Sequence, residues 1–324
     1  MTRWFQRTLA ALMSLGMLTA GLNVRAQEYP ARLVKLVVAS SAGTQFDAVT
    51  RVVGDELAKL TGKPVIVENR PGAEQVVGIE YVLGQPADGH TLFVASTTSL
   101  VTMPLLLKNL RFDPLKDLTP VALLVSGRLV VGSSAQHPWK TFDEFVKAVR
   151  EKPGQFNYGS VSTTSQLATA SFLYAPKLML DMTPVPYTNT ASYVQGLVGT
   201  DVHVGLLTEQ VASSLRGRFN PLAVTGSSRM PSQPQVPTLE ELGVPEVKGN
   251  TYVLFVKSGT PRPVVDRINA LTTQVMRSSE VKSRFEGMRL EVVPDTSVAT
   301  AAREVQREAQ RNAEVARKLN LQPK

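Results

Sequence analysis

Predicted strands and predicted helices alternate along almost the whole chain, and this alternation limits the possible folds more than any other feature. Continuous apolar runs at 32–39, 65–67 and 91–95 predict buried strands. The segment after Gly43 carries apolar residues at helical spacing, and Gly62 lies just beyond it as a helix stop. Further strands are predicted at 121–125, 129–131, 202–207, 222–225 and 252–256, and further helices from Thr141, from Thr260 and over 297–319. Such alternation favours an α/β fold with mainly parallel sheets.

The first 26 residues have the layout of a secretory signal peptide. Arg3 and Arg7 give a basic start, residues 9–22 form an apolar core, and Val24-Arg25-Ala26 places small residues before a cleavage site. A membrane anchor would need about 20 apolar residues, and this core is shorter. We therefore expect cleavage after Ala26, with Gln27 as the first mature residue, and a location in a bacterial periplasm.

The mature part is moderately basic and contains no cysteine. Loss of residues 1–26 removes three arginines and no acid, so the formal net charge falls from +8 to +5. The remaining length suits two domains or one large α/β unit. Without cysteine there is no disulfide, no thiolate zinc site and no cysteine nucleophile. Basic residues are evenly spread, which argues against nucleic acid, whereas the positive excess suits an anionic ligand.

Motifs for catalysis, metal binding and cofactor binding are absent from the sequence. His90, His137 and His203 stand alone, and neither G-x-S-x-G nor H-E-x-x-H occurs. Residues 84–91 resemble a phosphate-binding loop with histidine in place of lysine, but they precede a predicted strand instead of a helix. Asp88-Gly89 is therefore predicted to form a turn. No spacing brings two aspartates together as acid and base, so we expect no catalytic residue, no metal and no cofactor.

Three predicted strand-to-helix junctions are rich in serine and threonine, at 40–44, 96–99 and 160–165. Ligands of α/β sheets collect beyond the carboxyl ends of the strands, where helix N-termini offer free N–H groups to an anion. The alternative is that these hydroxyls only cap helices, because serine and threonine are preferred N-caps. The residues expected at a ligand site are Ser40, Ser41, Gly43, Thr44, Asp47, Ser96, Thr97, Ser160, Ser162, Thr163 and Thr164.

Two turn segments twenty residues apart carry a resemblance to a known family. Glu68-Asn69-Arg70-Pro71-Gly72-Ala73 follows a predicted strand, and Ala87-Asp88-Gly89-His90-Thr91-Leu92 leads into one. The pair resembles the hallmark of the Bug-type periplasmic receptors, the solute-binding proteins of tripartite tricarboxylate transporters. Further segments match the family in order, at 29–30, 112–121, 152–158, 185–187, 222–225, 236–238 and 259–261.

The resemblance implies a type II periplasmic binding protein fold with two α/β lobes and two crossing strands, which closes on a small carboxylate like a flytrap. It places lobe one at 27–124 plus 248–324 and lobe two at 125–247, and it adds Tyr187 and Thr208 to the expected site. The implied function is a monomeric receptor that delivers a small organic acid to membrane transporter subunits. A receptor that presents its ligand to a membrane sensor, and a periplasmic hydrolase on a similar scaffold, are the alternatives.

The chain departs from the family pattern at positions expected to contact ligand. A loop rich in proline and glycine usually follows the first strand, whereas residues 40–46 contain a single glycine. Thr188-Asn189 replaces a common Lys-Gly, an aspartate usual near Thr208 is missing, and residues 74–77 replace a glycine-rich stretch. A plain dicarboxylate and an acid that bears amide, hydroxyl or aromatic groups therefore both remain open as ligands.

Overall fold

The computed structural model describes residues 29–244 and 249–323. The predicted signal peptide, 1–26, and its cleavage site lie outside the described residues. Within the described part, no helix combines the length and the apolarity needed to cross a membrane.

The larger sheet has six strands. Its spatial order is β11 (Leu290–Val292), β4 (Leu118–Gly127), β10 (Asn250–Lys257), β3 (Thr91–Ser96), β1 (Val34–Val38) and β2 (Val65–Asn69). β1 pairs in parallel with β2 and β3, whereas β10 runs antiparallel between β3 and β4. The strand predictions at 32–39, 65–67, 91–95, 121–125 and 252–256 are confirmed within a few residues.

The expectation of mainly parallel sheets was wrong. Antiparallel pairs also join β11 to β4 and join β5 (Leu129–Ser134) to both of its neighbours. In the larger sheet, two of the antiparallel pairs arise because β10 lies between β3 and β4 and runs in the opposite direction to both. Its apolar run looks the same in the sequence whichever way the strand points, so the pattern of residues carries no information on direction.

Helices cover both faces of the six-stranded sheet. α2 (Gln45–Thr61), α10 (Arg262–Arg277) and α11 (Ser279–Gly287) pack on one face, where Leu36 and Leu92 point. α3 (Val76–Leu83), α4 (Thr97–Leu106) and part of α12 (Val298–Lys318) cover the other, where Val37 and Phe93 point. Successive residues of a strand thus point into the cores on opposite faces of the sheet, as the period-two geometry of a strand requires. α2 ends at Gly62 in the left-handed conformation, as predicted.

A second group of elements forms two smaller sheets with their own cores. β5 lies between β8 (Gly205–Thr208) and β9 (Phe219–Val224), and β6 (Asn157–Ser160) pairs with β7 (Thr183–Pro186). The helices here are α6 (Phe142–Glu151), α7 (Thr163–Leu173), α8 (Thr190–Val198) and α9 (Glu209–Ser214). The predicted capping box of Thr141 and Glu144 is present at the start of α6. Most of the remaining described residues form connections, including α5 (Pro114–Asp117) and the 3-10 turn η1 (Ala73–Gln75).

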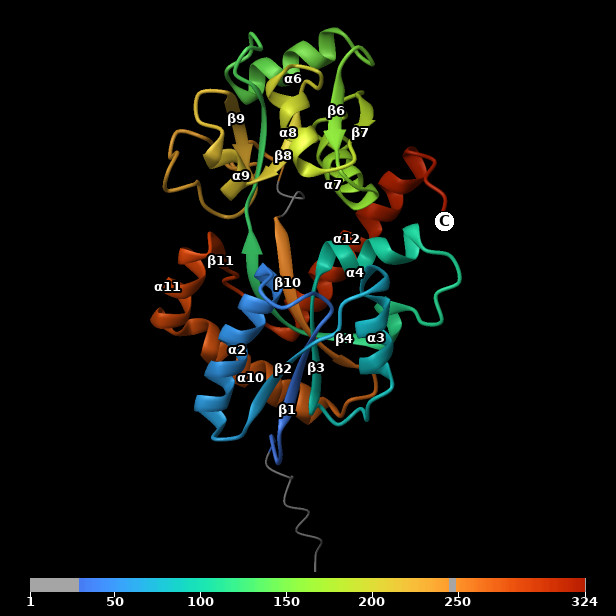
Figure 1. Cartoon of the computed structure of the whole chain (residues 1–324), viewed down its shortest axis with the longest axis vertical. Helices are drawn as coiled ribbons and strands as arrows, with labels where there is room; N and C mark the ends of the chain where they lie inside the picture. The colour runs from blue at the N-terminus through green and yellow to red at the C-terminus, as the bar shows by residue number, and fades with distance from the viewer. Residues whose placement is uncertain (1–28, 245–248, 324) are drawn as a thin grey trace, which may run out of the picture.

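The two groups of elements are joined in more than one place. β4 continues into β5 and so links the six-stranded sheet to the three-stranded one, as the green strand in Figure 1 shows. α12 packs against β4 and α4 and also against α7, and its Val315 and Ala316 belong to the core of the second group. The exact lobe boundaries at 124/125 and 247/248 stay a prediction.

Both turn segments noted in the sequence stabilise the ends of strands. Gly89 has a φ of +80°, the expected turn conformation, and its carbonyl accepts a hydrogen bond from the Tyr29 hydroxyl at 2.6 Å. Asp88 accepts from the His90 N–H at 2.9 Å and pairs with Arg32 at 2.7 Å. In the other segment, Asn69 at the end of β2 donates to the Ser40 carbonyl at 3.1 Å. These segments therefore hold the start of β3 and the loop after β1 in place.

Candidate functional site

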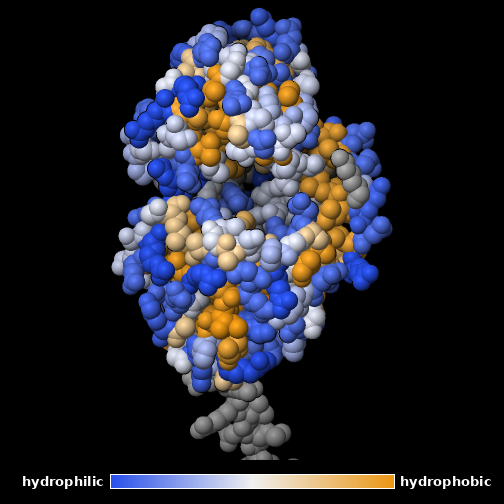
Figure 2. All heavy atoms as spheres, viewed as in Figure 1, coloured by the Kyte–Doolittle hydropathy of each residue, from blue (hydrophilic) through white to orange (hydrophobic). Residues whose placement is uncertain are grey.

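A cavity with seven serine and threonine residues in its wall lies where the two groups of elements meet. Its volume is about 250 Å³. We call it the hydroxyl-lined cavity, and its polar walls are Ser96, Thr98, Ser99, Ser162, Thr164, Ser165, Ser171, Asn250, Glu308, Arg311 and Asn312. The space-filling view shows the molecule hollowed between its upper and lower parts (Figure 2). Two of the three predicted hydroxyl junctions, after β3 and after β6, thus line one cavity.

The serines at these two junctions are also helix caps. The Ser96 hydroxyl accepts from the Ser99 N–H at 3.1 Å at the start of α4. At the start of α7, Ser162 accepts from the Ser165 N–H at 3.1 Å, and the Ser165 hydroxyl accepts from the Ser162 N–H at 3.0 Å. The capping interpretation is therefore confirmed for both serines. The Ser96 hydroxyl also donates to the Ser99 hydroxyl at 2.8 Å, so it could donate to a ligand only by turning away from this partner.

At the junction after β1, the Asp47 carboxylate forms its hydrogen bonds with other groups of the protein. Asp47 is buried, and its carboxylate accepts from the Gly43 N–H at 2.9 Å, from Asn69 at 2.9 Å and from Arg51 at 3.0 Å. Burial by itself raises the pKa of Asp47, but the hydrogen bonds from Arg51, Gly43 and Asn69 outweigh it and lower the pKa to about 2. Among the described residues, none from 40–47 lines the hydroxyl-lined cavity.

The other residues of the 40–47 loop stabilise it locally. The Ser40 and Thr44 hydroxyls are 2.9 Å apart, and Thr44 caps α2 by accepting from the Asp47 N–H at 3.3 Å. Ser41 and Gly43 are exposed. Gln45 accepts from the Tyr252 hydroxyl at 2.9 Å, so the loop is tied to β10, the strand next to β3. The structure does not bring the loop to the same cavity as Ser96 and Ser162.

The remaining predicted site residues are spread over several environments. Thr164 lines the hydroxyl-lined cavity, whereas Thr163 is half-buried in the first turn of α7. Ser160 is buried at the end of β6, and its carbonyl accepts from the Tyr187 N–H at 2.7 Å. The Tyr187 ring packs on Tyr193, with ring centroids 5.8 Å apart. Thr208 is an exposed cap of α9, 3.4 Å from the Val211 N–H.

A second cavity adjoins the first, and its wall contains more acidic side chains. Its volume is about 300 Å³, and it shares Gly249 and Glu308 with the hydroxyl-lined cavity. We call it the acidic cavity, because its walls include the carboxylates of Glu291, Asp295, Glu304 and Glu308. Thr97, another predicted site residue, also lies in its wall. The candidate site is therefore a pair of adjacent cavities, one rich in hydroxyls and one rich in carboxylates.

Sequence reasoning missed the contribution of α12. The charged sequence of 297–319 predicts a largely exposed helix with Val305, Ala309, Ala316 and Leu319 facing inward; Val305 and Ala316 are buried, and Ala309 and Leu319 are half-buried. The polar residues at 304, 308, 311 and 312, however, line the two cavities. Positions spaced by four and three residues share one face of a helix. That spacing is visible in the sequence, but nothing in the sequence shows that this face covers a cavity.

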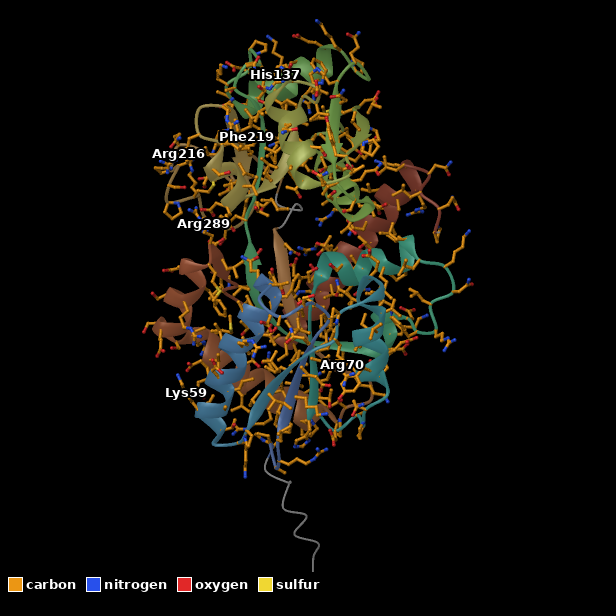
Figure 3. The ribbon with its side chains drawn as sticks, viewed as in Figure 1. Lys59, Arg70, His137, Arg216, Phe219 and Arg289 are labelled. Atoms are coloured by element: carbon orange, nitrogen blue, oxygen red, sulfur yellow. The ribbon has the colours of Figure 1, made fainter. Side chains whose placement is uncertain are left out.

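A partly buried network of ion pairs links the two groups of elements at another place. Glu209, at the start of α9, is 3.4 Å from Arg128 and 3.2 Å from Arg289, which lies between α11 and β11. Arg128 is also 3.1 Å from Glu291. Figure 3 shows Arg289 where the lower part of the molecule approaches the upper part. Sequence reasoning missed this network too, because its members lie far apart along the chain.

The sequence of the chain matches a known family over most of its length. The family described as the tripartite tricarboxylate transporter family receptor matches residues 49–321. The chain belongs to this family. A protein from the tcbD-tcbE intergenic region of Pseudomonas sp. strain P51 is 30% identical over 281 residues, which cover 85% of this chain and 83% of that protein. BugT of Bordetella pertussis is 27% identical over 311 residues, 92% of this chain and 94% of that protein.

Solved structures show the same fold. MatC of Rhodopseudomonas palustris, solved with malate, is 29% identical with a TM-score of 0.63, over 89% of this chain and all of MatC. An R. palustris protein solved with adipate is 25% identical with a TM-score of 0.67, over 92% of this chain and 100% of that one. A TctC solute-binding protein from Polaromonas reaches a TM-score of 0.76 at 23% identity, over 90% of this chain and 99% of that one.

These similarities confirm three predictions. The resemblance to Bug-type receptors was correct, and the fold is the α/β periplasmic binding protein fold of the solved relatives. The family is one of solute-binding receptors and not of enzymes. In addition, no group of three or more metal-binding side chains occurs in the described ranges 29–244 and 249–323.

Proposed function

We propose that this chain is an extracytoplasmic receptor that binds a small carboxylate-containing metabolite between two lobes and delivers it to a membrane transporter. The observation that carries the proposal is the hydroxyl-lined cavity, which the junctions after β3 and β6 share. Membership of the receptor family supports the class of function. The malate and adipate held by two solved relatives support a small carboxylate as the ligand.

The chemistry of the cavity suits a carboxylate. The starts of α4 and α7 lie in its walls, and helix N-termini attract anions through free N–H groups and the helix dipole. Serine and threonine hydroxyls of the wall, such as Ser96 and Ser162, donate to other protein groups, and rotation about the C–O bond would let them donate to a carboxylate oxygen instead. Hydrogen bonds to a charged acceptor are shorter and stronger than those between neutral groups. A small acid would therefore be held by helix starts and hydroxyls, in a cavity whose wall also includes Arg311.

The arrangement of the elements suits a hinge. We place lobe one at 27–124 with 248–324 and lobe two at 125–247, so that Ser96 and Ser162 approach the ligand from opposite lobes. A ligand that contacts both lobes binds the closed arrangement more tightly than the open one and shifts the population toward it. The hinge would lie at the ends of β4 and β10, the strands that pass between the lobes.

Native mass spectrometry and calorimetry of the purified protein test the proposal. A co-purified acid is expected in the native spectrum, and a calorimetric screen of mono- and dicarboxylates should yield at least one ligand. At 100 times its Kd this ligand should stabilise the fold by about 2.7 kcal/mol. If no acid binds, the proposed function is wrong. If the stabilising compound is consumed over hours, the chain acts as an enzyme and not as a receptor.

Export is tested separately. Relatives of this fold are periplasmic binding proteins, and the signal-peptide layout of residues 1–26 supports the same location. Edman sequencing of protein recovered from the periplasm should begin at Gln27 or within two residues of it. Recovery of the chain in a membrane fraction with Arg3 and Arg7 retained would contradict the prediction.

A further inference from the structure

Glu308 is the one acid that lines both cavities, and in the described part of the chain it has no cationic partner. It lies on α12, it is half-buried, and it contributes to the walls of both cavities. Its Oε1 accepts a hydrogen bond from the Thr98 hydroxyl at 2.6 Å. Within the described part of the chain, no ion pair includes Glu308. A carboxylate in a confined space with one neutral partner leaves most of its negative charge unbalanced.

The other carboxylates of the acidic cavity are already engaged. Glu291 is 3.1 Å from Arg128, and Glu304 is 3.2 Å from Arg307. Asp295 accepts from the Ser297 N–H at 2.9 Å and from the Thr300 hydroxyl at 2.5 Å. These contacts belong to ion pairs and to the cap of α12, whereas the hydrogen bond of Glu308 comes from a neutral hydroxyl and involves only its Oε1. Among the described residues there is no lysine or arginine in the wall of the acidic cavity, whereas Arg311, three residues beyond Glu308 on α12, lines the hydroxyl-lined cavity.

The wall beside Glu308 contains a second unsatisfied group. Thr97 is 1% exposed, and its hydroxyl has no hydrogen-bond partner among the described residues. It lies in the wall of the acidic cavity, one residue from Thr98, the partner of Glu308. Buried hydroxyls in folded proteins nearly always have a partner. An unpaired hydroxyl near a carboxylate whose one hydrogen-bond donor among the described residues is neutral indicates that a polar group of a ligand completes this wall.

We propose that Glu308 selects ligands that carry an ammonium group as well as a carboxylate. The inference rests on the proposed function, because it assumes that the carboxylate binds at the hydroxyl-lined wall. An ammonium group directed toward Glu308 has the opposite charge and donates up to three hydrogen bonds. The second carboxylate of a plain dicarboxylate in the same place meets a like charge, which is unfavourable in a confined space. The ligand class is therefore a small amino acid or amino-carboxylic acid.

Two matched pairs of acids test the inference by calorimetry. Butyrate and 4-aminobutyrate differ only in the amine, and so do glutarate and glutamate. In each pair, the wild-type protein should bind the amine-bearing acid at least tenfold more tightly. Glu308→Gln removes the charge while keeping the shape, and it should reduce this ratio to near one without weakening the amine-free acid. Glu308→Asp keeps the charge on a shorter side chain and should retain part of the ratio.

A control variant separates the site from a general change in charge. Glu314 is exposed on the same helix and lines neither cavity, so Glu314→Gln should leave the ratio unchanged. Thermal unfolding without ligand confirms that each variant is folded. The inference is overturned if the amine-free acids bind the wild type as tightly, or if Glu308→Gln weakens both members of a pair equally. If no acid of any kind binds the wild type, the proposed function falls as well, and this outcome is distinct from the first two.

Discussion

At the scale of single residues, Asp47 shows how a charge can serve the fold. Its contact with a ligand stays a prediction, whereas its carboxylate accepts hydrogen bonds from Gly43, Asn69 and Arg51. These bonds join the loop after β1 to the end of β2. They also explain the asparagine of the Glu68–Ala73 segment, because Asn69 donates to both Asp47 and the Ser40 carbonyl.

Replacement of Asp47 should therefore reduce stability more than affinity. Its pKa is lowered from 3.8 to about 2 in the folded protein, so the unfolded chain binds the proton more readily. The stabilisation is present above pH 4 and is lost as the pH falls toward 2. We expect Asp47→Asn to lose about 1–2 kcal/mol at pH 7 and little at pH 2, as measured by urea unfolding across this range. An equal loss at both pH values would show that the charge is not the cause.

Gly89 is the second residue with a specific structural requirement. Its φ is +80°, and a Cβ there would lie 2.5 Å from the Val264 side chain. Gly89→Ala should lose about 2–4 kcal/mol in urea unfolding, from backbone strain and from the clash together. Gly43 has a similar φ of +82° but open space around its Cβ position, so Gly43→Ala should lose about 1 kcal/mol from the backbone alone. Equal losses would rule out the clash as the reason for glycine.

At the scale of elements, the starts of the helices are the recurrent feature. Five helices begin shortly after a strand with a side chain that accepts a backbone N–H, and these caps are Thr44, Ser96, Ser162, Asn189 and Thr208. Capping explains why hydroxyl residues collect at the junctions whether or not a ligand is present. The effect of a substitution that tests ligand contact must therefore be compared with the effect of the same kind of substitution at a cap residue away from the cavity.

Ser162 and Thr141 provide this comparison. Each forms a capping box, Ser162 with Ser165 at the start of α7 and Thr141 with Glu144 at the start of α6. Ser162→Ala and Thr141→Ala should each lose about 1 kcal/mol of stability. Only Ser162→Ala should also weaken ligand binding, by about 1–3 kcal/mol, because Ser162 lines the cavity and a hydrogen bond to a charged group is lost. Calorimetry with the tightest acid of the screen measures this, and unchanged affinity in Ser162→Ala would exclude its hydroxyl from the site.

At the scale of the whole molecule, the network around Glu209 connects the two groups of elements. Glu209 in α9 pairs with Arg289 beside β11 and with Arg128 between β4 and β5. The side chains of Glu209 and Arg128 are only 6% and 10% exposed, so water screens them poorly. The network therefore favours the arrangement in which α9 and β11 approach each other.

Loss of the shared carboxylate should weaken that arrangement. Glu209→Gln leaves Arg128 and Arg289 without their common acid, and we expect a loss of about 2–3 kcal/mol in thermal or urea unfolding. The ligand-free protein should also show a larger radius of gyration in small-angle scattering. Glu241→Gln is the control, because the Glu241–Arg229 pair is exposed and such pairs contribute about 0–1 kcal/mol. If both variants behave alike, the network does not hold the two parts together.

Much of this protein was predictable from short stretches of sequence. The apolar runs of β1 and β3, the glycine stop at Gly62, the capping box at Thr141 and the turn at Asp88-Gly89 all follow from contacts within a few residues. The two turn segments also led to the correct family. Patterns of this kind are local, because helical and strand periodicity, caps and turn conformations depend on neighbouring residues.

The direction of β10 and the composition of the candidate site depended on the tertiary structure. The Thr98–Glu308 contact joins residues 210 positions apart, and Gln45 meets Tyr252 across 207 positions. The spacing of Glu304, Glu308 and Arg311 shows that they share a helix face, but only the packing of α12 against α4 and α7 directs that face to the cavities. Asp47 carries the same charge in the sequence as Glu308, yet the fold surrounds Asp47 with donors and leaves Glu308 with one neutral partner. Local sequence thus determined the elements and the family, whereas the partner of each charge was decided by contacts between distant segments, which depend on how the whole chain packs.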